Sequence, residues 1–256
     1  MRTLVFLTTL LVFTNSQAYT GLDIMKLNDA QRRVNDEQVE LKMILKNPQG
    51  QERVRELQVV TKTIEKDIQN SILKFKAPRN IAGTGLLTLE NKDTDDDQWL
   101  YLPTLKKSRR ISAADQTDSF MGTDFTYEDL NPENIEDFNY QIIASEKLTD
   151  VDCYKIEATP ANEKIKNKSG YSKRIIWIRQ DSNLAERIDF IDKQGKESKR
   201  LMAKDFITAS ENIFRAKSIV MQNLQTGHST SLIYDNFVIN QGIKSTLFTM
   251  RNLEQN

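Results

Sequence analysis

The sequence is poor in the residues that most often build covalent or catalytic sites. Cys153 is the only cysteine among 256 residues, so the chain cannot form an internal disulfide. A single thiol is more often a small buried hydrophobe than a reactive group. His228 is the only histidine, which removes the usual ligands of transition metals and the base of most Ser–His triads. No G-x-S-x-G elbow or phosphate-binding loop is present. We therefore expect a protein that is not an enzyme and that needs no cofactor.

The sequence also lacks an excess of either charge. Lys and Arg total 36, and Asp and Glu total 36. Nucleic-acid partners are usually met by a basic surface, so this balance gives no reason to expect one. After the first 18 residues no stretch is apolar enough to cross a bilayer, which needs ~20 residues.

Residues 1–18 have the features of an export signal. Arg2 is followed by an apolar run from Leu4 to Phe13, and Ser16-Gln17-Ala18 forms a small-x-small cleavage site. The run is too short for the alternative, an uncleaved membrane anchor. Tyr19 would be the new N-terminus and, not being a cysteine, cannot take a lipid there. We expect a cleaved signal peptide over 1–18, one domain over 19–256, and an exported, soluble mature protein.

Residues 21–34 are predicted to form an amphipathic helix, because Ile24, Leu27, Ala30 and Val34 recur at helical intervals. Strict alternation then begins. Residues 37–45 place Val39, Leu41, Met43 and Leu45 on one face. The turn residues of 47–50 separate this stretch from a second, charged one at 52–63, which predicts a β-hairpin.

Further stretches are predicted to be strands, with turn signals between them. They are residues 71–76, 85–90, 98–103, 107–111, 139–147, 152–160, 173–180, 184–192, 198–207, 215–224 and 228–239. About ten to twelve strands joined by hairpins indicate one antiparallel sheet that curls strongly or closes. We expect a mainly β fold: a single curved antiparallel sheet forming a half-open β-barrel capped by a few short helices.

Little helical material is available to cover the apolar face of such a sheet. The candidates are residues 21–34, 112–136 and 245–255. Because a sheet must cover its apolar face, the barrel either fills with its own side chains or keeps an apolar cavity. Residues 119–130, "SFMGTDFTYEDL", are too short and too polar for a core helix, and we interpret them as the rim or lid of that cavity. The alternative is that their aromatic side chains plug the barrel end.

Two charged clusters each have a functional and a structural interpretation. Asp93, Asp95, Asp96 and Asp97 have the spacing of the first ligands of a calcium loop, but Gln98 replaces the required glycine. We therefore interpret this cluster as a solvated acidic turn and expect no metal site. The basic residues are Lys106, Lys107, Arg109 and Arg110. They either protect an edge strand from aggregation or dock an acidic partner or anionic headgroups.

Several motifs resemble the longer members of the outer-membrane lipoprotein-sorting (LolA-like) family of periplasmic proteins. They are Trp99, Tyr101, Leu102 and Pro103, then Arg109-Arg110-Ile111, then residues 119–130, and the closing 247–254 "LFTMRNLE". The motifs cover about a sixth of the chain, while the export signal and strand pattern agree over its whole length. The chain is about fifty residues longer than the shorter, best-known carriers, and longer forms could serve other lipids.

The resemblance implies a monomeric carrier of lipoprotein acyl chains, or of another lipid, across the periplasm. It implies partners in an inner-membrane export machinery and in an outer-membrane acceptor. The alternative is a non-catalytic structural module of an envelope complex with a filled barrel. From alternation and from the 119–130 stretch, the side chains expected at the cavity or lid are Leu41, Met43, Phe75, Leu89, Trp99, Tyr101, Phe120, Met121, Phe125 and Tyr127.

Overall fold

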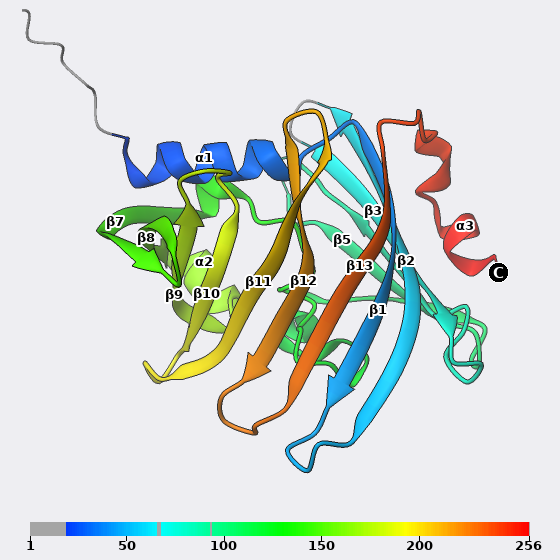
Figure 1. Cartoon of the computed structure of the whole chain (residues 1–256). Helices are drawn as coiled ribbons and strands as arrows, with labels where there is room; N and C mark the ends of the chain where they lie inside the picture. The colour runs from blue at the N-terminus through cyan, green and yellow to red at the C-terminus, as the bar shows by residue number, and fades with distance from the viewer. Residues whose placement is uncertain (1–18, 66–67, 93, 256) are drawn as a thin grey trace, which may run out of the picture.

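A computed structural model describes residues 19–65, 68–92 and 94–255. Its main element is one antiparallel sheet of 13 strands, bent into a half-open barrel (Figure 1). The strands are β1 (Asp36–Lys46), β2 (Glu52–Glu65), β3 (Ile68–Ala77), β4 (Gly85–Leu89), β5 (Asp97–Leu102), β6 (Lys107–Arg110), β7 (Phe138–Leu148), β8 (Val151–Pro160), β9 (Tyr171–Arg179), β10 (Ala185–Asp192), β11 (Glu197–Ser210), β12 (Ile213–Asn223) and β13 (Ser229–Ile239). The expected fold class is confirmed. The predicted signal peptide lies outside the described residues.

Two meanders are joined in the middle of the sheet. The strand order is β6-β5-β4-β3-β2-β1-β13-β12-β11-β10-β9-β8-β7, so the first and last strands are neighbours. Leu41 pairs with Tyr234 across this seam. The predicted hairpin is confirmed, with Lys46 opposite Glu52. Because β6 and β7 are the two edges, the segment that connects them must span the open side of the barrel.

The N-terminal helix α1 (Gly21–Arg32) lies across the top of the barrel in Figure 1. Thr20 and Asp23 cap each other's backbone at its start. Ile24 and Met25 pack against strands β8 and β9. Leu27, which we expected on the buried face, is 38% exposed. Ile24 of the predicted face is buried, but Leu27 and Ala30 are exposed because the helix turns its 24–25–28 stripe toward the sheet.

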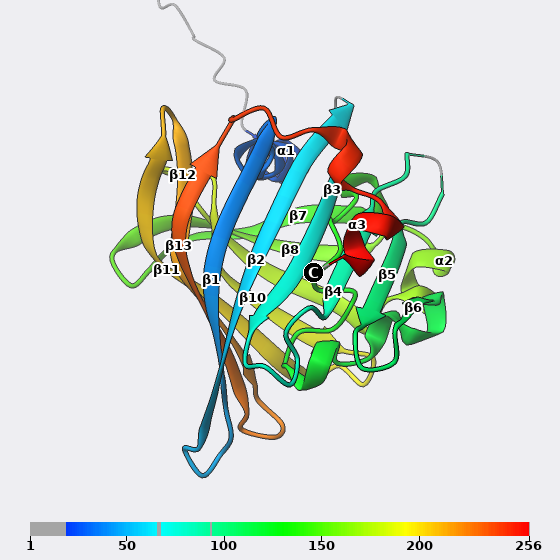
Figure 2. The ribbon, with the colours of Figure 1, turned by 90° about the vertical axis from the view of Figure 1, so that its right-hand side faces the viewer.

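The chain between β6 and β7, residues 111–137, is here called the inner loop. It contains three 3₁₀ turns, η1 (Ala113–Thr117), η2 (Phe120–Gly122) and η3 (Ile135–Asp137), and lies within the concave side of the sheet (Figures 1 and 2). The sequence did not indicate α2 (Glu163–Lys168), a single turn capped by the Asn162 side chain.

The C-terminal pieces η4 (Ser245–Leu247) and α3 (Met250–Glu254) cover the outer face of β2–β5 (Figure 2). Phe248 and Leu253 pack there against Val60, Ile72 and Leu87. The third candidate for covering the concave face therefore covers the convex one instead. In the part of the chain that the structure describes, no helix is long and apolar enough to cross a membrane.

Candidate functional site

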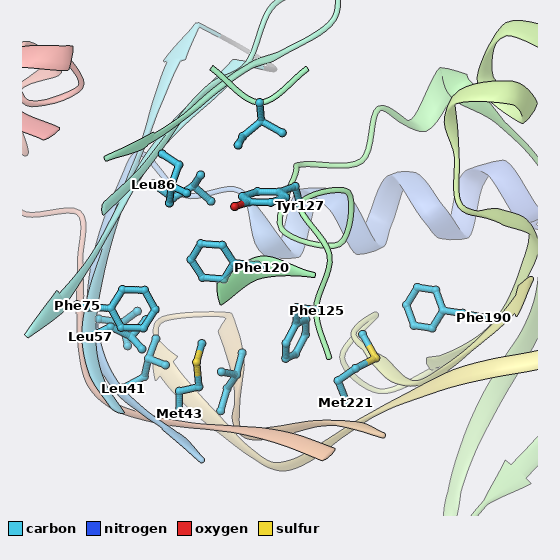
Figure 3. Packing of buried hydrophobic residues seen from close by; sticks show 14 of the residues in the cluster. Leu41, Met43, Leu57, Phe75, Leu86, Phe120, Phe125, Tyr127, Phe190 and Met221 are labelled. Carbon is cyan, nitrogen blue, oxygen red and sulfur yellow. The ribbon is translucent and has the colours of Figure 1, made fainter. Parts of the chain in front are cut away.

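The concave side of the sheet is filled at one end by a packed cluster of apolar side chains. Phe120 of the inner loop is fully buried. Its ring stacks on Phe75 of β3 at 5.9 Å and meets Tyr127 edge-on at 5.6 Å. Leu41 and Met43 of β1 complete this packing from the wall (Figure 3). Phe120 and Tyr127 therefore fill the barrel at this end.

The inner loop makes its tightest turn at Met121 and Gly122. Both residues have left-handed backbone angles, with φ of 51° and 72°, which glycine adopts freely and methionine rarely does. The Phe120 N–H donates to the Phe125 carbonyl at 2.8 Å, which closes the turn. The Arg55 guanidinium of β2 donates to the Met121 carbonyl at 2.8 Å. Thr230 of β13 accepts from the Asp124 N–H at 3.0 Å, so side chains of two wall strands hold the turn.

Beyond Phe125 the interior is hollow. A cavity of about 470 Å³ lies between α1, the inner loop, β1–β2 and β9–β13, within the roughly 300–1,000 Å³ typical of ligand sites. Phe125, Met221 and Phe190 border it (Figure 3). The other apolar side chains in its wall are Met25, Val39, Val59, Phe138, Ile165, Ile176, Leu184, Ala185, Ile188, Leu201, Ala203, Phe206, Ala216, Ile219, Tyr234 and Phe237.

Arg174 of β9 marks one polar border of the cavity. Its guanidinium donates to Glu128 at 3.2 Å and also to Glu133. It lies 4.9 Å from the centre of the Phe138 ring. Burial disfavours the charged form, but Glu133 and Glu128 outweigh it, so the pKa of Arg174 is raised and the cation persists. The acidic part of the inner loop is thereby fixed to the wall.

A second buried ion pair fixes the same loop to β11. Asp129 accepts from the Lys199 ammonium at 2.7 Å and from the Tyr171 hydroxyl at 2.8 Å. Burial, and then the Asp129 charge, raise the pKa of Tyr171. Lys199 also donates to the Asp124 carbonyl at 3.1 Å. Polar contacts, rather than apolar packing alone, hold the half of the loop that faces the cavity.

At the other polar border, Arg215 of β12 joins the end of α1 to β1. Its guanidinium donates to the Glu37 carboxylate at 2.8 Å and to the Gln31 carbonyl at 2.9 Å. Both Arg215 and Glu37 line the cavity. Arg174 and Arg215 are therefore both paired with carboxylates at the borders, and most of the wall between them is apolar.

The structure separates the predicted cavity residues into three groups. Phe125 belongs to the packed cluster and also lines the cavity. Leu41, Met43, Phe75, Phe120 and Tyr127 belong to the packed cluster, and Met121 packs against it. Their roles toward a lid or ligand stay predictions.

Three of the predicted side chains are on the wrong face. Leu89, Trp99 and Tyr101 pack with Leu253 on the outer side of the sheet. Strands β4 and β5 are apolar on both faces, so alternation alone could not tell inside from outside. These three side chains point outward because the C-terminal helix α3 covers the outer face of β4 and β5.

The basic residues are on or beside the edge strand β6. Lys106 lies just before it, and Lys107 and Arg109–Arg110 lie on it. Arg109 pairs with Asp115 at 3.3 Å, and Arg110 Nε donates to Asp97 at 2.7 Å. The edge location fits the interpretation that these charges protect an unpaired strand. Docking to a partner or headgroup stays a hypothesis.

The acidic cluster is distributed among several partners. Asp93 lies outside the described residues. Asp95 pairs with Lys168 at 3.1 Å, and this contact lowers the pKa of Asp95. Asp96 accepts from the Asn131 side chain at 2.7 Å, and burial raises its pKa. Within the described ranges no three His, Cys, Asp or Glu residues group as metal ligands do.

Sequence reasoning missed most of the cavity wall. Ile188 of β10, Leu201 of β11, and Ile219 and Met221 of β12 line it. Alternation along these strands was visible, but the same pattern would arise in a filled barrel. Only the position of the inner loop, whose packed aromatic side chains fill one end of the barrel, shows which of these residues border the cavity.

Comparisons with known proteins identify relatives over nearly the whole chain. A family model described as an uncharacterised protein matches residues 67–255. No protein with a curated description is similar to the chain. A domain from Vibrio parahaemolyticus described as an outer membrane lipoprotein-sorting protein is 30% identical, with a TM-score of 0.86, over 92% of this chain and 98% of that one.

Two other solved structures share the fold. A DUF1329 family protein from Desulfovibrio piger is 27% identical, with a TM-score of 0.85, over 91% of this chain and 97% of that one. A LolA superfamily protein from Nitrosomonas europaea is 22% identical, with a TM-score of 0.72, over 91% and 99%. The last likeness concerns the fold alone.

Proposed function

The chain belongs to the LolA-like family of outer membrane lipoprotein-sorting proteins, and from this premise we propose that it is a periplasmic lipid carrier. It holds lipoprotein acyl chains, or those of another lipid, in the cavity bordered by Phe125, Phe190 and Met221. It receives them from an inner-membrane export machinery and delivers them, as a monomer, to an outer-membrane acceptor. The observation that carries the proposal is the apolar cavity of about 470 Å³ inside the half-open barrel.

The energetics of an acyl chain require such a site. Each buried methylene contributes about 0.8 kcal/mol, so a 16-carbon chain gains roughly 13 kcal/mol at full burial. A free chain of that length cannot cross an aqueous compartment at a useful concentration, and an apolar cavity solves this without any catalysis. The cargo then moves in one direction because each successive partner binds it more tightly, and no chemical reaction is needed to drive the transfer.

Release requires that the cavity can open, and the inner loop is the element suited to this. The polar contacts of Arg174 and Lys199 hold its cavity half, and Met121 and Gly122 form its tight turn. When the loop opens, these charges regain the hydration that they lack in the closed state, which offsets part of the attraction that is broken. We propose that the loop moves about this turn when cargo enters or leaves.

The first experiment is native mass spectrometry of the protein purified from membranes, followed by identification of the co-purifying lipid. The second uses Ala203→Phe, which fills the cavity from β11, with the exposed Ala161→Phe as matched control. Excluding two methylenes costs ~1.6 kcal/mol, so a fluorescent acyl probe should bind Ala203→Phe about 15-fold more weakly. Equal binding by the two variants, both folded by circular dichroism, would contradict the proposal.

A structural module of an envelope complex is the second candidate. It is favoured by the solid packing of Phe120 against Phe75 and Tyr127 at the other end of the barrel. A clean lipid-free mass, together with no uptake of the acyl probe by the wild-type protein, would favour this role over transport.

A further inference from the structure

The volume of the cavity limits how much cargo it can hold. An apolar protein cavity of about 150 Å³ takes up benzene, which corresponds to ~25 Å³ for each of its six carbons. At that ratio a cavity of about 470 Å³ has room for ~19 carbons. One lipid chain of about 16–18 carbons therefore fills the cavity, and two such chains would need roughly twice the volume.

The packed cluster prevents the cavity from extending toward the other end of the barrel. Phe75 and Phe120 are fully buried, and their rings stack at 5.9 Å. Met43 and Tyr127 belong to the same cluster and are also buried. Making room for a second chain there would separate these side chains, which is as unfavourable as opening a void in any close-packed core.

Aromatic side chains narrow the cavity from the wall strands. Phe206 of β11 and Phe237 of β13 line it. The Phe237 ring stacks with the Tyr234 ring at 6.0 Å. The Arg179 guanidinium lies 4.4 Å from the centre of the Phe206 ring. Because each ring packs against a neighbour, the sides of the cavity resist widening.

A second hollow borders the inner loop but does not extend the apolar space. Polar side chains such as Lys193 and Gln194 line it. Glu128 lines both this hollow and the cavity, and its carboxylate accepts from the Gly170 N–H at 2.8 Å and from Arg174 at 3.2 Å. Acyl carbons placed against such a wall would remove the hydration of its polar groups without replacing their hydrogen bonds. A second chain is therefore not favoured there.

We propose that the protein carries one acyl chain at a time, so that its cargo is a single-chain lipid such as a fatty acid or a lysophospholipid. The inference rests on the proposed function and names the lipid class that the cavity selects. A two-chain phospholipid would leave one of its chains in water, where exposed methylenes are unfavourable. Both single-chain candidates offer the cavity the same chemistry, one apolar chain, and differ only in the polar group.

The first test counts bound molecules by native mass spectrometry. The purified protein is titrated with palmitic acid and, separately, with palmitoyl lysophosphatidylethanolamine. We expect saturation at one molecule of lipid per chain in both titrations, and the tighter ligand identifies the source. Ala203→Phe fills the cavity, so a second bound molecule whose binding this substitution also weakens would overturn the proposal. So would a two-chain phospholipid that co-purifies with the wild-type protein but not with Ala203→Phe.

The second test measures the chain length at which binding stops improving. Saturated fatty acids of increasing length displace a fluorescent acyl probe, and each buried carbon should raise the affinity about fourfold. The gain should end at ~19 carbons, because further carbons stay in water. Phe206→Ala should move this limit to longer chains, by at most about six carbons, since the ring that it removes has the size of benzene.

Phe214→Ala is the matched control and should leave the limit unchanged, since Phe214 is also partly buried, on the neighbouring strand β12, but does not line the cavity. Phe237→Ala, which also enlarges the cavity, replaces Phe206→Ala if circular dichroism shows that the latter does not fold. A wild-type affinity that still rises beyond ~22 carbons, or a limit that neither cavity variant moves, would overturn the single-chain proposal and leave the carrier proposal intact. A wild-type protein that binds no fatty acid of any length would overturn the carrier proposal itself.

Discussion

Arg174 is the side chain on which two acidic residues of the inner loop converge. Glu128 and Glu133 accept its hydrogen bonds, and all three side chains are less than one-fifth exposed. Arg174→Met should therefore lower the free energy of unfolding by about 3–5 kcal/mol, because it leaves buried carboxylates without a counter-charge. Urea denaturation measures this.

The control is Arg110→Met, which removes an exposed pair with Asp97 and should cost no more than about 1 kcal/mol. Arg174→Lys should not restore the wild-type stability, since an ammonium cannot hold both carboxylates as the planar guanidinium does. Full rescue by lysine would show that only the charge matters at this position.

Phe120 and Phe125 are five positions apart in the same loop and differ in what surrounds them. Phe120→Ala should lower the free energy of unfolding by about 3–5 kcal/mol, because the ring is fully buried in the packed cluster. Phe125→Ala should also lower the free energy of unfolding, because this ring is buried in the same cluster. Since Phe125 lines the cavity as well, its removal should in addition enlarge the cavity and change the affinity for acyl probes of different length. Thermal denaturation and a chain-length series of probes distinguish the two effects. Probe affinities altered by Phe120→Ala but not by Phe125→Ala would reverse these assignments.

Among the elements, the C-terminal helix α3 stabilises the barrel by packing on the outer face of the sheet. Leu253 of α3 is fully buried, and a Cβ added at Gly85 would lie 2.7 Å from its Cδ1 atom. Leu253→Ala should therefore cost about 2–4 kcal/mol of unfolding free energy and leave the affinity for an acyl probe unchanged, since α3 is on the convex face. Leu105→Ala, at a side chain 62% exposed, is the control and should be nearly neutral. Weakened probe binding in a folded Leu253→Ala variant would link the outer face to the cavity.

The strands also show which parts of the fold could be predicted from the sequence. Alternation placed Leu41 and Met43 on the inner face correctly, because the other face of β1 is charged. It failed at Leu89, Trp99 and Tyr101, because β4 and β5 carry apolar residues on both faces. Local periodicity determines which residues share a face. It does not determine which face the distant C-terminal helix will cover.

The cavity was harder to predict than the sheet. That a hollow could exist followed from the shortage of covering helices. Its position follows from where the inner loop docks, which depends on ion pairs between residues far apart in sequence, such as Asp129 with Lys199.

At the scale of the whole molecule, Asp189 makes the free energy of unfolding depend on pH. Its carboxylate is 3% exposed and is held by Arg187 and by Arg200, the latter at 2.7 Å. Burial alone would raise the pKa of Asp189, but the hydrogen bonds from both arginines outweigh it and the pKa is lowered below its ordinary value of 3.8. The stabilisation is therefore fully present above the unfolded-state pKa and is lost as the pH falls through the lowered one.

Asp189→Asn should reduce the unfolding free energy near pH 7 by about 2 kcal/mol, because charge-assisted hydrogen bonds are replaced by weaker ones. The deficit should shrink as the pH falls below about 4, where the wild-type carboxylate also becomes protonated. Urea denaturation of both proteins across this range measures the two curves. Parallel curves at every pH would show that Asp189 does not titrate with unfolding.

The seam between β1 and β13 affects how the sheet can be assembled. β1 meets β2 through a local turn, but its other neighbour is the last strand of the chain, with Leu41 opposite Tyr234. During synthesis the first hairpin therefore stays unpaired along one edge until the final strand is available. Such distant pairing slows folding and leaves a temporary aggregation surface. The β1–β13 pairing is thus completed last. A chain that ended before β13 would form two separate partial sheets rather than a smaller barrel.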